Sequence, residues 1–325
     1  RNVDAIVGYI SSGNCQALAP VAEELKQFTI FATCGTPRIF EEAERKYVFR
    51  TMGHATADNV AAAMYVKEKF PDMKGYTGIN QNYAWGQDSW RDFDLTLQQI
   101  MPNTKASDKT QFPKIFAGQY GSEISAMSLD KADLIHTSFW GGDLEAFIFQ
   151  GNARGLFKKK IGVFTVGGTA AYRLGKKLPN GLVLGARGPY GILVKDRPSA
   201  LNQWFINTYK DIYGIYPSGP AYQYGQAILA AKIAYDKAGS DASNEQLANA
   251  LRGITFESFS TTVEMTLGGG HQAATENGYG ITEYDSENGE NVVKDVKFYP
   301  ASCVLPPEGQ NSVDWIKGGM KGAKC

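Results

Sequence analysis

Short apolar runs alternate along the chain with longer segments in which apolar residues recur at helical spacing. The apolar runs predict strands at residues 3–10, 29–33, 47–50, 75–79, 114–117, 134–138, 161–166 and 182–185. The segments between them predict helices at residues 15–27, 57–70, 90–101, 123–129, 144–155 and 170–178. Such repetition of strand and helix predicts an α/β protein with parallel sheets whose faces are covered by helices.

The length and composition of the chain indicate two globular lobes. With 325 residues, 43% of them hydrophobic and 20% charged, each half can bury a core of its own. The 33 Lys and Arg residues balance the 33 Asp and Glu residues, so the charge favours neither nucleic acid nor an anionic membrane surface. The longest apolar stretches, such as residues 227–231, are far shorter than the roughly 18 residues that indicate a membrane span.

Small polar loops follow the first two predicted strands. Ser11 and Ser12 end the first strand and open a helix, and Cys34, Gly35 and Thr36 follow the second strand. Sheets of this kind bind ligands at the carboxyl ends of their strands. A helix N-terminus with free N–H groups and two hydroxyls can hold a carboxylate. The alternative is that the serines only cap the helix.

Aromatic residues recur after the later strands. Each of them alone could equally belong to the core or to the surface, but their recurrence at successive strand ends predicts the apolar walls of a cleft. These residues are Tyr83, Trp85, Phe139, Trp140, Tyr190, Tyr222 and Tyr224.

The sequence lacks the motifs of several enzyme classes. It contains no Gly-x-x-x-x-Gly-Lys-Ser/Thr loop, no Gly-x-Gly-x-x-Gly after a strand and no Gly-x-Ser-x-Gly elbow. His54 and His136 have no nucleophile near them in sequence, and the carboxylates form no metal-ligand pattern. We therefore expect a protein that is not an enzyme and that uses neither a cofactor nor a metal ion.

The four cysteines form no Cys-x-x-Cys pair, which argues against a zinc site. Cys303 and Cys325 lie in a tail rich in proline and glycine. A disulfide between them would stabilise the tail by about 3 kcal/mol on the loop-entropy model and would indicate an oxidising compartment. The alternative is two unrelated thiols. Cys15 and Cys34 either pair with each other or stay reduced near a cleft.

Five segments carry a resemblance to a known family. Residues 5–12 resemble its strand leading to a ligand-binding serine, and residues 33–37 resemble its second ligand loop. Residues 48–51 match its Phe-Arg-Thr strand, residues 82–86 resemble its Asp-Tyr-Ala-Tyr-Gly crossover, and residues 222–235 resemble the helix before its last domain crossing. In order and spacing, over nearly the whole chain, these segments resemble the type I periplasmic solute-binding proteins of the branched-chain amino-acid and aromatic-acid (leucine-binding protein-like) family.

This resemblance implies two Rossmann-like α/β lobes with parallel central sheets, joined by a multi-strand hinge. We expect residues 1–85 plus 239–298 to form the first lobe and residues 86–238 plus 299–325 to form the second. The implied function is that of the extracytoplasmic, periplasmic solute-binding component of an ABC importer. Such a protein is a monomer that closes on a small carboxylate or amino acid and presents it to a membrane permease, without binding nucleic acid.

The resemblance also implies roles for individual residues. Ser12 and Thr36 would hold the ligand carboxylate with hydroxyl and N–H groups, and Cys34 would hold it with its backbone. Tyr190 would close over the ligand from the other lobe. Phe139 or Trp140 would form an aromatic wall, and Tyr222 the far end of the pocket. The complete set of expected ligand-binding residues is Ser11, Ser12, Cys34, Gly35, Thr36, Tyr83, Phe139, Trp140, Tyr190 and Tyr222.

The sequence departs from the family pattern in two ways. The usual first half-lobe, with two strands and two helices, has no counterpart before Val3, and we expect a separate N-terminal segment to carry it. No acidic residue near residues 217–223 is placed to pair with a ligand ammonium, which favours an aromatic or aliphatic acid without an α-amino group. Two other functions stay open: a sensory or regulatory module of the same fold for a small amide or acid, and a hydrolase, which the missing nucleophile argues against.

Overall fold

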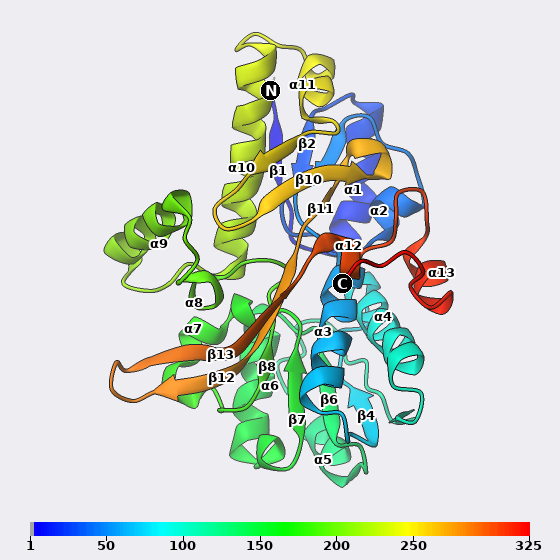
Figure 1. Ribbon diagram of the computed structural model, residues 1–325, viewed down its shortest axis with the longest axis vertical. Coiled ribbons are helices and arrows are strands. Elements are labelled where there is room, and N and C mark those ends of the chain that lie inside the picture. The colour runs from blue at the N-terminus through cyan, green and yellow to red at the C-terminus, as the bar shows by residue number, and fades with distance from the viewer. Residues whose placement is uncertain (1–2) are drawn as a thin grey trace.

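Two α/β lobes, each built around its own sheet, make up the computed structural model, which describes residues 3–325 (Figure 1). Within that range the first sheet has the strand order β1-β2-β3-β11-β10-β9. Its strands are Ile6–Gly8 (β1), Thr29–Phe31 (β2), Val48–Arg50 (β3), Gln272–Ala274 (β11), Thr262–Leu267 (β10) and Thr255–Glu257 (β9). The second sheet has the order β13-β12-β8-β7-β6-β4-β5. Its strands are Glu290–Tyr299 (β13), Asn277–Asp285 (β12), Val183–Leu184 (β8), Ile161–Phe164 (β7), Leu134–Thr137 (β6), Gly75–Gly78 (β4) and Lys105–Ala106 (β5).

Helices cover both sheets. The α-helices are Ser12–Glu24 (α1), Arg38–Glu41 (α2), Ala55–Lys69 (α3), Ala84–Ile100 (α4), Gly121–Leu129 (α5), Gly141–Ala153 (α6), Ala171–Leu174 (α7), Gly191–Val194 (α8), Ala200–Tyr213 (α9), Gly219–Ala238 (α10), Asn244–Leu251 (α11), Ala301–Val304 (α12) and Ser312–Lys317 (α13). The 3-10 helices are Leu156–Lys158, Gly167–Thr169, Gly175–Lys177 and Gly268–Gly270. Among residues 3–325, no helix combines the length and the apolar character that a membrane crossing requires.

The predicted parallel strands form the centre of each sheet. Strands β1, β2, β3 and β11 pair in parallel, as do β5, β4, β6, β7 and β8. Antiparallel strands complete one side of each sheet: β10 and β9 beside β11, and the hairpin of β12 and β13 beside β8. The strand predicted at residues 114–117 is wrong, because this segment is a turn that leaves Phe116 71% exposed.

The chain crosses between the lobes three times: between β3 and α3, between α9 and α10, and between β11 and β12. The lobe boundaries expected at residues 85, 238 and 298 therefore differ from those of the structure. Helix α3 and strand β4 belong to the second lobe, α10 packs on β1 and β2 of the first lobe, and β12 and β13 belong to the second sheet. The C-terminal segment lies on the second lobe as expected, because α12 packs on α3 and α13 packs on α4.

Helix α3 shows why the second lobe has a dense core. Its residues are small or apolar on nearly every side, including Ala61, Ala62, Tyr65 and Val66, which are fully buried. A helix without a polar face is stable only when other elements surround it. Helices α4 and α12 and strand β12 all pack against α3, and the small side chains let them approach it closely.

Two disulfides tie down segments near the ends of the chain. The expected bond between Cys303 and Cys325 is present, with 4.7 Å between the Cα atoms. Cys303 is fully buried among residues of the second-lobe core, including Trp315 and Ile316. Cys15 and Cys34, for which the sequence left two alternatives, are also bonded, with Cα atoms 6.4 Å apart. This second bond links helix α1 to the loop that follows β2.

Acid should destabilise the protein through His136, whose ring is fully buried against Trp90 and Phe93. Burial lowers the pKa of His136 to about 3, from the usual 6.5 that it regains on unfolding. Between these two values the unfolded chain binds a proton that the folded chain does not, so stability falls as the pH falls. One such group contributes about 1.4 kcal/mol per pH unit.

We expect His136→Gln to reduce the pH dependence of the unfolding free energy between pH 6 and pH 4 by up to this amount. Urea unfolding of both proteins at several pH values measures the two slopes. Equal slopes would show that His136 takes up no proton on unfolding in this range.

Candidate functional site

A cavity of about 260 Å³ lies between the two lobes. It is formed by the loops after β1 and β2 of the first lobe, the loops after β4, β6, β7 and β8 of the second lobe, and the start of α10. The residues that line it are Ile10, Ser12, Thr33, Gly35, Tyr83, Trp85, Trp140, Gly141, Val166, Thr169, Tyr172, Arg173, Arg187, Ser218, Pro220 and Gln223. The carboxyl ends of the parallel strands of both sheets therefore meet at one cavity, which is where α/β sheets bind ligands.

A larger recess of about 600 Å³ lies between α2, α11 and residues 306–311. Its described lining residues include no tryptophan or tyrosine, and its walls mix acidic and basic side chains such as Glu44, Arg45 and Arg252. This larger recess lies outside the place where the carboxyl ends of the parallel strands of both sheets meet. We therefore take the interlobe cavity as the candidate site.

The first lobe contributes a loop of fixed conformation. The Oγ of Ser12 accepts hydrogen bonds from the backbone N–H groups of Gly35 and Thr36, at 3.2 and 3.1 Å. Because the oxygen of Ser12 is occupied in this way, its own proton is left to donate to a ligand. From behind, Nη1 of the buried Arg50 donates to the carbonyls of Cys34 and Thr36, at 2.8 and 2.7 Å. Burial lowers the pKa of Arg50 to about 9.

Arg187 brings a positive charge from the second lobe to this loop. Its side chain is only 7% exposed, and its Nη2 donates to the carbonyl of Thr33. Its guanidinium carbon lies 4.7 Å from the centre of the Trp85 ring. Nη1 lies against Gly35, and the buried Nε has no hydrogen-bond partner among the described residues. Burial lowers the pKa of Arg187, and the charge of Asp58 opposes that shift.

Three aromatic side chains form a wall of the cavity. Trp85 is 3% exposed and donates from Nε1 to the carbonyl of Ser138 at 2.9 Å. Trp140 donates from Nε1 to the hydroxyl oxygen of Tyr83 at 2.9 Å. Burial raises the pKa of Tyr83, so this hydroxyl stays protonated and can donate to a ligand.

The electrostatics of the cavity favour an anion. The N-terminal ends of α1, α4, α6 and α10 all reach it, and none of their N-cap residues makes a side-chain capping bond. Free N–H groups and the positive end of the helix dipole stabilise negative charge. Among the described lining residues there are two arginines, Arg173 and Arg187, and neither aspartate nor glutamate. Arg173 is half exposed and forms an ion pair with Glu145, so Arg187 carries the buried positive charge.

Ser12, Gly35, Tyr83 and Trp140 are the four expected binding residues that the structure brings together at the cavity. Trp85, which the sequence placed among the aromatic cleft walls, also lines the cavity, and the lining residues that sequence reasoning missed include Thr33, Thr169, Arg187 and Gln223. Arg187 had one usable signal, because it is a lone cation two residues after the strand predicted at residues 182–185.

Other expected residues of the first lobe lie beside the cavity without lining it. Ser11 is the half-buried N-cap of α1. Cys34 is fully buried and bonded to Cys15, and its backbone carbonyl accepts from Arg50. Thr36 is fully buried, with its N–H bonded to Ser12 and its hydroxyl bonded to Asp88. Both polar groups that were expected to hold the carboxylate at Thr36 are therefore engaged within the protein.

The remaining expected residues pack in the core of the second lobe. Phe139 is fully buried against Tyr120 and Phe147. The hydroxyl of Tyr190 donates to the carbonyl of Leu184 at 3.4 Å. The hydroxyl of Tyr222 donates to Oδ1 of Asn202 at 2.8 Å. In this arrangement the three rings support the loops around the cavity and do not line it.

Fold and site together define a two-lobed α/β protein with a cavity between its lobes. A family described as periplasmic binding protein matches residues 1–290, and the chain belongs to that family. The fold expected from the sequence is thereby confirmed. A comparison with curated protein sequences finds no match.

Solved structures share this fold. The solute-binding protein of an ABC transporter from R. palustris, in complex with benzoate, has a TM-score of 0.74 and 19% identity, and the match covers 90% of this chain and 77% of that one. A solute-binding protein from Rhodopseudomonas palustris HaA2, in complex with p-hydroxybenzoic acid, has a TM-score of 0.79, 16% identity and coverage of 92% and 79%. A leucine-binding protein from Thermotoga maritima MSB8 has a TM-score of 0.72, 18% identity and coverage of 90% and 79%.

Proposed function

We propose that this protein is the extracytoplasmic solute-binding component of an ABC importer and that it binds a small carboxylate in the interlobe cavity. The observation that carries the proposal is the buried Arg187, which lies against the loop of Thr33 and Gly35 in a cavity with no acidic side chain among its described lining residues. A carboxylate there would accept from Nη1 of Arg187 and from the hydroxyl of Ser12. Such charge-assisted hydrogen bonds are roughly twice as strong as neutral ones.

The rest of the ligand would lie against Trp85, Tyr83 and Trp140. Flat aromatic walls with a few polar groups suit the ring of an aromatic acid, and the volume of about 260 Å³ suits a molecule of that size. Benzoate and p-hydroxybenzoic acid are bound by two of the solved structures that share the fold. An α-amino group would be buried there without a carboxylate to pair with it, which is costly.

Binding would proceed by hinge closure at the three crossings between the lobes. The two sides of the cavity come from different lobes, so a ligand that contacts both sides favours the closed form. The closed protein would then deliver its ligand to a membrane permease. Two disulfides fit the oxidising compartment in which such proteins work. We infer that the protein acts by binding, without turnover of the ligand.

The test compares acids with and without an ammonium group. We expect benzoate, 4-hydroxybenzoate and 3-phenylpropionate to raise the thermal unfolding midpoint and to bind in calorimetry, because each offers a carboxylate and a ring. Phenylalanine, which is 3-phenylpropionate with an added ammonium, should not. A ligand at 100 times its Kd stabilises the folded state by about 2.7 kcal/mol. Leucine serves as a second amino acid in the test. If phenylalanine and leucine bound but the three acids did not, the proposed ligand class would be wrong. If none of these compounds bound, the proposed carboxylate site would be wrong.

A further inference from the structure

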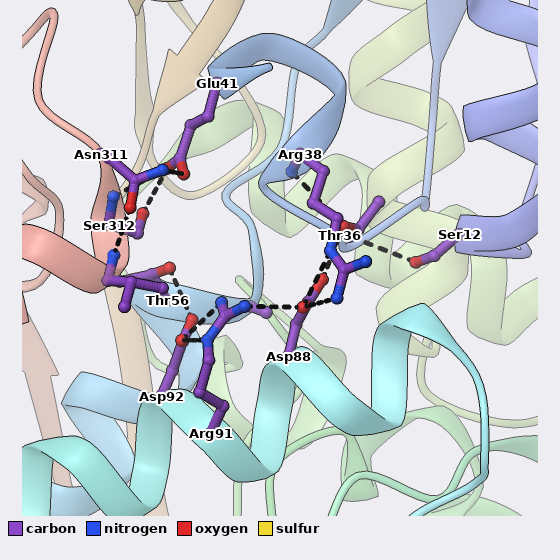
Figure 2. Close-up of polar contacts among 12 residues, drawn as sticks. Ser12, Thr36, Arg38, Glu41, Thr56, Asp88, Arg91, Asp92, Asn311 and Ser312 are labelled. Atoms are coloured by element: carbon purple, nitrogen blue, oxygen red, sulfur yellow. Dashed lines mark hydrogen bonds and ion pairs between the residues drawn. The ribbon is translucent and has the colours of Figure 1, made fainter.

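Helix α2 follows directly after the ligand loop of residues 33–36, and both of its ends are bonded to the second lobe (Figure 2). We call this set of contacts the α2 clasp. Its members are Thr36, Arg38 and Glu41 from the first lobe and Asp88, Asn311 and Ser312 from the second. The clasp lies behind the loop, outside the cavity itself.

Asp88 is the centre of the first half of the clasp. Its carboxylate is fully buried on α4, and its Oδ2 accepts from the hydroxyl of Thr36 at 2.6 Å. Its Oδ1 accepts from Nε and Nη2 of Arg38, at 3.1 and 2.7 Å, and from Nη1 of Arg91 at 2.9 Å. Removing a partner from such a buried charge is costly, so these contacts hold the loop and α4 together firmly.

Thr36 transmits this contact to the candidate site. Its hydroxyl bonds Asp88, while its N–H group bonds the Oγ of Ser12, which lines the cavity. Trp85 lies three residues before Asp88 on α4, and its ring packs against Gly35. One helix therefore presents an aromatic ring to the cavity and a carboxylate to the back of the loop that faces this ring.

Glu41 forms the second half of the clasp at the other end of α2. It accepts from Nδ2 of Asn311 at 3.0 Å and from the N–H group of Ser312 at 3.2 Å, and the hydroxyl of Ser312 also donates to it. Asn311 is the N-cap of α13, which packs on α4. Both ends of α2 are therefore bonded to α4 or to the start of α13, two helices of the second lobe that pack against each other.

We propose that Asp88 is a positioning residue for ligand binding, which acts through Thr36 to fix the ligand loop and to join the two lobes in the closed form. This inference rests on the proposed function. Loss of the Asp88 contacts removes none of the groups that would touch the ligand, but it loosens the loop of residues 33–36 and the closed form. The expected consequence is faster ligand release with little change in the rate of association.

Asp92 on the same helix provides a matched control. It is also fully buried, and it accepts from the hydroxyl of Thr56 at 2.7 Å and from Nε of Arg91 at 2.8 Å. Both partners belong to the second lobe, so Asp92 makes no contact with the ligand loop (Figure 2). Asp88→Asn should weaken benzoate binding at least tenfold through the dissociation rate, whereas Asp92→Asn should change it less than threefold. Equal losses in the two variants would overturn the inference.

A second pair of variants covers the case in which Asp88→Asn does not fold. Thr36→Val removes only the hydroxyl that Asp88 accepts from, and Thr36→Ser keeps it. We expect a loss of about tenfold in benzoate affinity for the valine variant and recovery of most of that loss for the serine variant. Similar affinities in both variants would show that the bond to Asp88 does not act on the ligand.

Hydrogen exchange without ligand separates this inference from the proposed function. Asp88→Asn should speed amide exchange in residues 34–41, and Asp92→Asn should leave those residues unchanged. If the wild-type protein binds no benzoate but the exchange of residues 34–41 responds as expected, the ligand class is wrong and the positioning role of Asp88 on the loop is retained. If exchange there is unchanged in Asp88→Asn, the positioning role is wrong whatever the ligand.

Discussion

Replacing Arg187 with methionine is expected to weaken benzoate binding by about 30- to 1,000-fold. The substitution keeps an apolar stem against Trp85 but removes the guanidinium, which donates to Thr33 and lies against Gly35. Truncating one partner of a buried, hydrogen-bonded charge pair costs about 2–4 kcal/mol in a binding site, which corresponds to that range of affinity. Calorimetry with benzoate on wild-type and variant protein measures the effect.

Arg197 supplies the control, because it too is an arginine stacked on an aromatic ring. Its guanidinium carbon lies 3.7 Å from the centre of the Phe298 ring, it pairs with Glu276, and it does not line the cavity. Arg197→Met should leave benzoate affinity within about threefold of wild type, since a charge outside the cavity is largely screened from the ligand. Losses of the same size in both variants would mean that Arg187 affects benzoate binding through the overall charge of the protein and not through direct contact with the ligand.

Parallel strands could be predicted from the sequence because their residues are buried on both faces. Strands β2, β6 and β7 are short, mostly apolar and almost entirely buried, and the strands predicted at residues 29–33, 134–138 and 161–166 contain them. Strand β5 gives no such signal, because Lys105 and Ala106 at the sheet edge are both exposed. The hairpin of β12 and β13 is half exposed and carries many charged residues, so its pattern is that of a polar segment.

The lobe boundaries depend on where short segments cross, which local sequence does not encode. Residues 51–54 and 275–276 have the composition of ordinary loops, yet the chain changes lobes at both. Only the hydrogen bonding of β4 with β6, and of β12 with β8, decides to which sheet the following elements belong.

The candidate site, like the fold, contains residues that the sequence could predict and residues that it could not. Ser12, Gly35, Tyr83 and Trp140 directly follow strands, so position along the chain was enough to predict them. Arg187 reaches the cavity through the tertiary arrangement of its loop, where it adopts the left-handed backbone conformation with φ of 53°. Tyr190 and Tyr222 also follow strands or open helices, but their hydroxyls find partners in the core at Leu184 and Asn202. Such partners cannot be read from residue type.

Gly35 follows a predicted strand, but the other lobe leaves no room for a side chain at this position. Its replacement by alanine is therefore the second substitution for which we expect a large loss of ligand affinity. A Cβ atom at this position would overlap Nη1 of Arg187 and the ring of Trp85. Arg187 can swing away, but the Trp85 ring is 3% exposed and held by its bond to Ser138. Gly35→Ala should therefore push the lobes apart at the cavity and cost about 2–3 kcal/mol in ligand binding, or roughly 30- to 150-fold in affinity.

Gly142→Ala is the matched glycine variant for this measurement. Gly142 lies in the exposed first turn of α6, and a Cβ there meets no atom within 4 Å. Alanine at this position should keep benzoate affinity within about twofold and stabilise the helix by about 0.5–1 kcal/mol. If Gly35→Ala bound benzoate as tightly as Gly142→Ala, the ring of Trp85 could leave the loop without loss. The contact between the two lobes at Gly35 would then not belong to the ligand-bound form.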